Sequence, residues 1–353
     1  MAQPGKAQLR RVQSGTRRSG LRAALIACKL AVCTLTVFTL AAGWLLGAEP
    51  ALAQTAPVRK FTVVATTGMI ADAARNIGGS SAEVSALFGP GVDPHGHRTT
   101  QTDIASMTRA DLVLWNGLYL EAQMEGFLRD LARRKPVVAV AEALPKDILL
   151  EDEDNKGKFD PHLWMDTSLW SRVVAAIKDA MIAARPDARD TFEANATRYL
   201  REIETVGAYA KRVLATVPAD RRVVVSAHDA FNYFGKAHGY EVVGIQGIST
   251  ESEAGLAKIR ELVELVVTRT LPAIFVETSV SDRNIQAVIE GAQARRHGVK
   301  IGGELFSDAL GDAGTYEGTY VGMVDHNVTT VTRALGGEAP ARGMQGKLAA
   351  PKT

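Results

Sequence analysis

The strongest constraint on the fold is a regular alternation of short β-rich runs with helical stretches, which begins near residue 60. The alternation stops once, over residues 168–217, where no strand pattern occurs, and then resumes to about residue 335. Strands that alternate with helices favour parallel sheets built from β-α-β units. The sequence therefore predicts an α/β fold with two lobes, one on each side of a helical middle.

The expected elements follow from apolar periodicity and from the positions of glycine and proline. In the first lobe we expect strands 60–65, 83–88, 111–115 and 136–140, and helices 69–77, 102–107 and 121–133. In the second lobe we expect strands 222–226, 241–245, 273–277 and 300–301, and helices 230–238, 254–269, 282–297 and 316–335. Thr250-x-x-Glu253 matches a capping box and is expected to begin helix 254–269.

The helical middle divides at Pro186 into helices 168–184 and 187–217. At 1.5 Å per residue the second helix, of about 31 residues, would extend about 46 Å, enough to connect two lobes as a rigid backbone. We therefore expect an N-terminal lobe at 54–186, a linking helix at 187–217 and a C-terminal lobe at 218–337. The tail 338–353 is rich in Gly, Pro and Ala and is expected to be disordered.

Residues 1–53 have the order of a secretory signal peptide. Basic residues precede an apolar run at 30–48, and Ala51-Leu52-Ala53 provides a cleavage site. We expect removal after Ala53 and a periplasmic location. An uncleaved anchor is the alternative, because the apolar run approaches the length that spans a bilayer. Lipidation at Cys28, within Leu25-Ile26-Ala27-Cys28, is less favoured because Arg22 leaves almost no apolar run before it.

Composition narrows the chemistry of the remaining chain. Both cysteines, Cys28 and Cys33, lie in the signal segment, so disulfides and thiolate metal ligands are excluded from the part expected to fold. The segment also carries 7 Lys and Arg and 1 Glu, so its removal leaves 41 − 7 = 34 basic and 39 − 1 = 38 acidic residues, a net charge of −4. The chain beyond it has no pattern typical of nucleic-acid binding, and we expect no nucleic-acid partner.

The tripeptide Asp-Pro-His occurs twice, at Asp93-Pro94-His95 and at Asp160-Pro161-His162. Proline fixes its own φ and restricts the residue before it, so the backbone that leads into each histidine is stiff. A histidine held in this way suits a metal site, whose ligands need a defined orientation. A single histidine at a strand end is more often a hydrogen-bonded structural group, but the repeated context favours a ligand role here.

Two further candidates follow strands of the second lobe. His228 comes directly after strand 222–226, and Asp308 lies beyond the strand near 300. Ligands of open α/β sheets collect beyond the carboxyl ends of the strands. We therefore expect His95, His162, His228 and Asp308 to meet between the lobes and to bind a metal ion. Carboxylates that would orient the histidines are expected among Asp93, Asp160, Asp229 and Glu304, with loop capping as the alternative role.

The other histidines fit structural roles better. His97 is two residues beyond His95 and is expected to point away from the site. His238 and His297 stand at helix ends, and His326 lies inside the last helix as a packing residue.

Several segments resemble the metal-binding receptors of bacterial ABC importers for manganese, zinc and iron, the solute-binding proteins of cluster A-I. They are listed in chain order: 64–72, 89–95, 159–166, 227–234, 275–280 and 301–310. The resemblance covers residues 60–336 and implies two α/β lobes that flank a rigid helix, with the metal between them. It implies the same four ligands, His95, His162, His228 and Asp308.

The resemblance further implies capture of a divalent ion and its delivery to a membrane permease with a cytoplasmic ATPase. We expect a monomer that is not an enzyme and has no catalytic cofactor. The segment 146–158 is short, acidic and free of histidine, whereas zinc-dedicated relatives often carry a His-rich loop there. We expect manganese first, zinc next and iron third, although zinc should bind more tightly by the Irving–Williams order. The alternatives are a secreted metal-dependent hydrolase and a surface adhesin with a structural metal.

Overall fold

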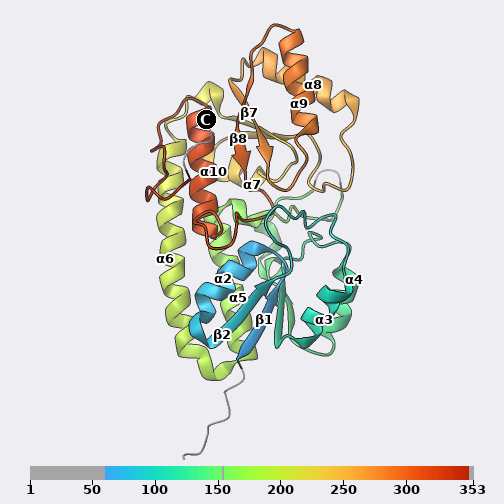
Figure 1. Ribbon diagram of the computed structural model, residues 1–353, viewed down its shortest axis with the longest axis vertical. Coiled ribbons are helices and arrows are strands. Elements are labelled where there is room, and N and C mark those ends of the chain that lie inside the picture. The colour runs from blue at the N-terminus through green and yellow to red at the C-terminus, as the bar shows by residue number, and fades with distance from the viewer. Residues whose placement is uncertain (1–59, 153–154, 350–353) are drawn as a thin grey trace, which may run out of the picture. The chain divides into compact units, whose positions relative to one another are not determined.

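Strands and helices alternate through the first half of the fold, as the sequence predicts (Figure 1). The computed structural model describes residues 60–152 and 155–349. The elements of the first lobe are β1 (Phe61–Ala65), α2 (Gly68–Gly78), β2 (Ala82–Ala86), α3 (Gln101–Arg109), β3 (Leu112–Trp115), α4 (Glu125–Ala132), β4 (Val137–Ala139) and α5 (Thr167–Ala184). Their strands form one parallel sheet in the order β2-β1-β3-β4.

Both faces of this sheet are covered, and the side chains divide between the faces with the period of two that a strand imposes. Val63 and Leu112 point into a core that they share with α2, α5 and α6. Val64 and Val113 point to the opposite face, where a smaller core includes residues of α3 and α4. A sheet buried on both sides needs continuously apolar strands, which explains the run Leu112–Trp115.

The second lobe contains two parallel strand pairs, β5-β6 and β7-β8. Its elements are β5 (Val223–Ser226), α7 (Asn232–His238), β6 (Glu241–Gly244), α8 (Leu256–Thr268), β7 (Ala273–Glu277), α9 (Arg283–Ala294), β8 (Lys300–Leu305) and α10 (Tyr320–Ala334). Strands β5 and β7 lie next to each other. The carboxyl ends of β5, β7 and β8 therefore come to one edge, which faces the first lobe in Figure 1.

Helix α6 (Arg189–Leu214) joins the lobes and packs against α2, α5 and α10. In Figure 1 it runs along both lobes. One continuous apolar core includes residues of both lobes and the inner face of α6, such as Phe192, Tyr199 and Val206. The helix has 26 residues, fewer than the 187–217 expected from sequence, because residues 186–188 form a separate 3₁₀ turn at Pro186 and the helix ends at Leu214 rather than at 217.

Other boundaries also differ from the sequence prediction. Helix α4 begins at Glu125 rather than at 121, because Glu121 accepts hydrogen bonds from the backbone at the end of β3 instead of opening a helix. Helix α10 begins at Tyr320, where Thr319 caps it, and not at 316. Strand β8 is longer than predicted and extends to Leu305.

The capping box predicted at Thr250-x-x-Glu253 is wrong. Helix α8 begins at Leu256, with Gly255 at its N-cap and no side-chain cap. The Thr250 hydroxyl instead donates to the Asp93 carboxylate of the first lobe, 2.5 Å away. A tertiary contact has therefore replaced the local one.

The expectation of a disordered tail is corrected for residues 338–349. The backbone N–H of Met344 donates to both carboxylate oxygens of Asp325 at 2.9 Å, and the N–H of Glu338 donates to Thr216. Leu348 is only 4% exposed. These contacts hold the segment against α10 and the end of α6.

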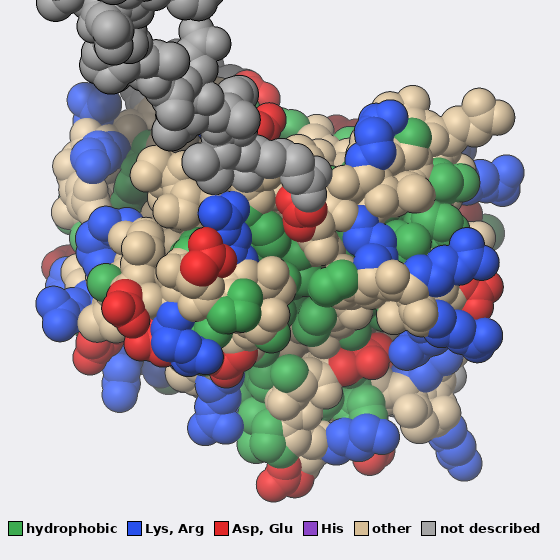
Figure 2. Space-filling model, turned by 90° about the horizontal axis from the view of Figure 1, so that it is seen from below, with side chains coloured by type: hydrophobic (Ala, Val, Ile, Leu, Met, Phe, Trp, Pro, Cys, Tyr) green, Lys and Arg blue, Asp and Glu red, His purple; other side chains and the backbone are tan. Residues whose placement is uncertain are grey.

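The face seen in Figure 2 carries interspersed Lys/Arg and Asp/Glu side chains with apolar side chains between them. Through residues 60–152 and 155–349, no helix has the length and apolar character needed to cross a membrane. The predicted signal segment 1–53 lies outside the described residues.

Candidate metal centre

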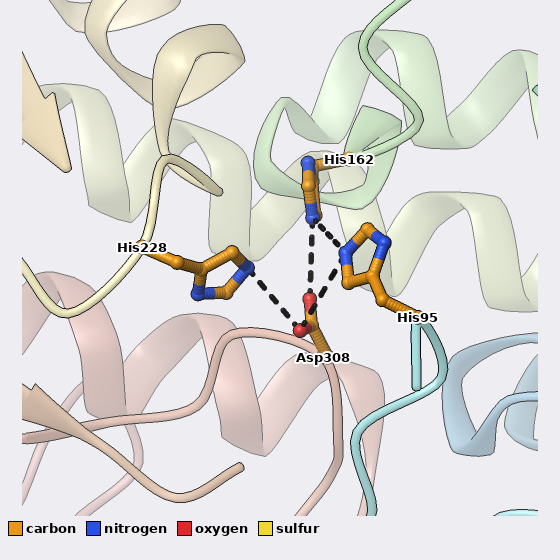
Figure 3. A group of neighbouring side chains, drawn as sticks. All are labelled: His95, His162, His228 and Asp308. Carbon is orange, nitrogen blue, oxygen red and sulfur yellow. Dashed lines mark hydrogen bonds and ion pairs between the residues drawn. The ribbon is translucent and has the colours of Figure 1, made fainter. Parts of the chain in front are cut away.

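The four predicted ligands meet at one point between the lobes (Figure 3). His95 lies in the loop after β2, and His162 directly precedes a 3₁₀ turn at Leu163–Met165. His228 follows β5, and Asp308 follows β8. Each side chain offers one ligand atom, and these atoms all lie within 4.8 Å of one another. The carboxyl ends of parallel strands, together with the loop that carries His162, therefore build the cluster.

Short distances join the polar atoms of the cluster. The Nε2 atom of His162 lies 3.3 Å from Asp308 Oδ1, and Nε2 of His228 lies 3.2 Å from Asp308 Oδ2. His95 Nε2 is 3.3 Å from His162 Nε2 and 4.0 Å from Asp308 Oδ2. All four residues are buried, His95 being the most exposed at 2%. Three imidazole nitrogens and a carboxylate thus converge in a space from which water is largely excluded.

Nε2 of His228 and both carboxylate oxygens of Asp308 form no hydrogen bond of good geometry among the described residues, although they lie close to one another as ion-pair partners. Buried polar groups without partners are rare and costly, on the order of 1–3 kcal/mol each. A divalent cation between the imidazoles and the carboxylate would satisfy them, so the donor set and its geometry fit a metal ion.

Buried carboxylates orient two of the histidines. Asp160 Oδ1 accepts hydrogen bonds from the His162 backbone N–H at 2.9 Å and from Nδ1 of its ring at 2.7 Å. Glu277 accepts from the His228 backbone N–H at 2.9 Å and from ring Nδ1 at 2.5 Å. A proton on Nδ1 leaves Nε2 free as the ligand atom, because a neutral imidazole has one donor and one acceptor nitrogen.

Burial and charge move the histidine pKa values in different directions. Burial lowers the pKa of His95 to about 3. Burial also acts to lower the pKa of His162, but the attraction of Asp160 and Asp308 outweighs it and raises that pKa to about 9. The same opposition raises the pKa of His228 well above its usual value, with Glu277 and Asp308 as the attracting groups. The pKa of Asp308 is held well below its usual range because attraction to His228 and His162 exceeds the effect of burial.

Of the carboxylates predicted to orient ring nitrogens, only Asp160 does so. Asp93 accepts the backbone N–H of His95 at 2.8 Å but does not contact the ring nitrogens. Within the described residues, the side chains of Asp229 and Glu304 form no hydrogen bond with the four predicted ligands, and Glu304 is exposed. Sequence reasoning missed Glu277. Glu277 could have been found from its position as the last residue of β7, because this strand lies next to β5, which precedes His228.

The remaining histidines lie outside the cluster, as predicted. His97 contacts Asp103 at 3.1 Å, and His297 contacts the Leu271 carbonyl at 2.9 Å. His238 packs against Phe234, and His326 packs against Phe306.

Residues 63–334 match the model of a protein family described as "Zinc-uptake complex component A periplasmic". The match covers most of the chain. The chain belongs to this family.

Curated relatives from two organisms support the assignment. The chain is 45% identical over 277 residues to the manganese-binding lipoprotein MntA of Bacillus subtilis, covering 78% of this chain and 90% of the relative. It is 45% identical over 298 residues to the zinc-binding protein TroA of Treponema pallidum, covering 84% and 96%. The solved structure of the periplasmic zinc-binding protein TroA from T. pallidum matches with a TM-score of 0.76 and 46% identity, covering 78% of this chain and 99% of that one. The two-lobed α/β fold predicted from sequence is confirmed.

Proposed function

We propose that this protein captures one divalent metal ion outside the cytoplasm and delivers it to the permease of an ABC importer. The ligands are His95, His162 and His228, through Nε2, and the carboxylate of Asp308. The observation that carries the proposal is the convergence of these four buried groups, with two rings fixed by Asp160 and Glu277. The names of the relatives, which bind manganese or zinc, agree with it.

Capture and delivery fits this site better than catalysis. Catalytic zinc sites typically have three protein ligands and leave one position for water or substrate. Here four protein groups converge and the most exposed of them is only 2% exposed, so a substrate has little room. A structural metal in an adhesin would not require ligands from two separate lobes, which must part before an ion can be released.

Manganese is the proposed cargo, with zinc as a tight competitor and iron third. The two oxygens of Asp308 face different imidazoles, 3.3 Å and 3.2 Å away, and this suits a carboxylate that binds through both oxygens. Three nitrogens and two oxygens exceed the four donors of a usual protein zinc site. Zinc should nevertheless bind more tightly in solution.

The receptor delivers the ion to an ABC permease, which works with a cytoplasmic ATPase. It acts as a monomer of two lobes, at 54–186 and 218–337, which the helix region 187–217 links.

The expected location is the periplasm, after cleavage at Ala53. Relatives named as lipoproteins give weight to the alternative, lipidation at Cys28. Mass spectrometry of the N-terminus from native membranes and periplasm separates the two.

The decisive test measures metal stoichiometry and affinity by competition with a chelator. One ion per chain is expected, and His95→Ala should weaken binding by at least about 100-fold, because the loss of an orienting contact alone already costs 10- to 100-fold. His97→Ala, two residues away and outside the cluster, is the matched control. A stoichiometry near zero, or unchanged affinity in His95→Ala, would contradict the proposal. Metal analysis of protein from its native compartment then identifies the cargo.

A further inference from the structure

The aspartates of the two Asp-Pro-His repeats occupy equivalent positions in the structure. In each repeat one carboxylate oxygen accepts the backbone N–H of the histidine two residues later. Asp93 Oδ1 accepts from His95 at 2.8 Å, and Asp160 Oδ1 accepts from His162 at 2.9 Å. Each aspartate thereby closes a short loop around its proline and sets the direction in which its histidine leaves the backbone.

In both repeats the second carboxylate oxygen accepts a hydrogen bond from the opposite lobe. Asp93 Oδ2 accepts from the Thr250 hydroxyl at 2.5 Å. Asp160 Oδ2 accepts from the side-chain amide of Asn232, at the start of α7, at 3.2 Å. Thr250 and Asn232 belong to different segments of the second lobe. Two independent bonds therefore end on the two residues that position the first-lobe ligands.

Further contacts hold the same two segments. The Tyr233 hydroxyl donates to the Asp160 carbonyl at 3.0 Å, next to the Asn232 bond. The side-chain amide of Gln123 in the first lobe donates to Glu251, the neighbour of Thr250, at 2.5 Å. The segment around Thr250 and the start of α7 thus contact the first lobe at the loops that carry His95 and His162.

From this arrangement we infer that Thr250 and Asn232 are positioning residues that couple closure of the lobes to the orientation of His95 and His162. The inference rests on the proposed function. With the lobes together, each aspartate is held at both oxygens and its histidine is fixed. When the lobes part, both second-lobe donors leave, each Asp-Pro-His loop loses one restraint, and the two ligands loosen as the ion is released.

When the lobes part, His228 and Asp308 move away from the ion with the second lobe. Because the coupling loosens His95 and His162 at the same time, the ion is released faster than it would be if only the second-lobe ligands were lost. A hydrogen bond to an ionised carboxylate is among the stronger ones in proteins. Removal of either donor should therefore raise the rate of metal release without removing a ligand. Neither Thr250 nor Asn232 lies within the four-ligand cluster.

The test loads the purified protein with Zn²⁺ and follows release into an excess of a colorimetric zinc chelator. Thr250→Val keeps the shape of the side chain and removes its hydroxyl, and Asn232→Ala removes the amide. Each should release zinc about tenfold faster, the change that about 1.4 kcal/mol of lost hydrogen bonding produces. Thr250→Ser restores a hydroxyl and should return the rate to that of the wild type.

Two matched controls make the same kind of bond within one lobe. Thr268 donates to Glu264 on α8, and Asn155 donates to Asp152 in the first lobe. Thr268→Val and Asn155→Ala should release zinc at the wild-type rate. Urea unfolding of the metal-free variants separates faster release from general destabilisation, and Thr250→Val decides alone if Asn232→Ala fails to fold.

The inference is overturned if Thr250→Val releases zinc within about twofold of the wild-type rate, or if the controls accelerate equally. It is also overturned if Thr250→Ser is as fast as Thr250→Val. Failure of the wild-type protein to hold zinc would instead refute the proposed function, so the two failures are distinguishable.

Discussion

Replacement of Glu277 by glutamine perturbs the second-lobe histidine without touching a ligand. The buried Glu277 carboxylate accepts both the backbone N–H of His228, at 2.9 Å, and its ring Nδ1–H, at 2.5 Å. Glutamine offers one acceptor oxygen and one donor group, so one of these N–H groups loses its acceptor. Loss of such an orienting partner typically weakens metal binding by about 10- to 100-fold, or about 1.4–2.7 kcal/mol.

The same change alters the protons that the metal displaces. At pH 6.5 the raised pKa values of His162 and His228 mean that both rings carry a second proton and are positively charged in the metal-free protein, whereas the lowered pKa of His95 leaves that ring neutral. Because coordination requires neutral imidazole, binding of one ion should release about two protons. Removal of the Glu277 charge lowers the pKa of His228 and leaves Asp308 as the attracting group, so Glu277→Gln should release fewer protons than the wild type.

Calorimetric titration with Zn²⁺ in buffers of different ionisation enthalpy counts these protons directly. The proton release also predicts how affinity depends on pH: wild-type affinity should fall about 100-fold for each unit of pH below the pKa values of His162 and His228, and variant affinity should fall less steeply. The affinity deficit of Glu277→Gln should therefore shrink as the pH falls. Glu304→Gln, an exposed change in the same lobe, is the control. Equal proton release by Glu277→Gln and the wild type would refute the reasoning.

Three further changes test the packing and the buried charges. Gly207→Ala would place a methyl group 2.5 Å from the Thr167 hydroxyl between α6 and α5, and should lower the free energy of unfolding by about 1–3 kcal/mol in urea titrations. Tyr233→Phe removes a hydroxyl that joins two backbone groups, and should cost about 2–4 kcal/mol in the same assay because both groups lose a partner. Burial raises the pKa of Glu121 to about 7, so the folded protein binds more protons than the unfolded one between about pH 4.5 and 7, and stability falls as the pH rises through this range. Glu121→Gln removes this dependence, so the unfolding free energy of the variant should rise by about 3 kcal/mol relative to that of the wild type between pH 4.5 and 7.5. If the difference between variant and wild type is the same at both pH values, the raised pKa of Glu121 is contradicted.

Local signals were sufficient to single out the four residues that cluster and to predict most of the elements. The repeated Asp-Pro-His marks His95 and His162 because proline fixes its own φ and restricts the residue before it, whatever the rest of the fold does. His228 and Asp308 could be placed because a parallel sheet brings the carboxyl ends of its strands to one edge.

Predictions that depended on which segments meet were less successful. The Thr250-x-x-Glu253 pattern satisfies a local rule for a helix start, yet its threonine donates to Asp93, 157 residues earlier in the chain. Residues 338–349 have the composition of a disordered tail, yet Asp325 accepts the backbone N–H of Met344. In both cases a carboxylate that is distant in sequence supplies a hydrogen bond that local composition does not reveal.

Periodicity and backbone restriction within a few residues were enough to predict the fold class, the residue types of the candidate metal centre and the stiffness of the two Asp-Pro-His loops. The carboxylates that orient the histidines, and the groups that hold the loops from the opposite lobe, became evident only from the packing of the whole chain. Glu277 reaches His228 because β7 lies next to β5, and Asn232 reaches Asp160 because α7 meets the first lobe. A hydrogen bond forms only when donor and acceptor lie within about 3 Å of each other. For residues far apart in the sequence, the packing of strands and lobes decides which pairs come that close.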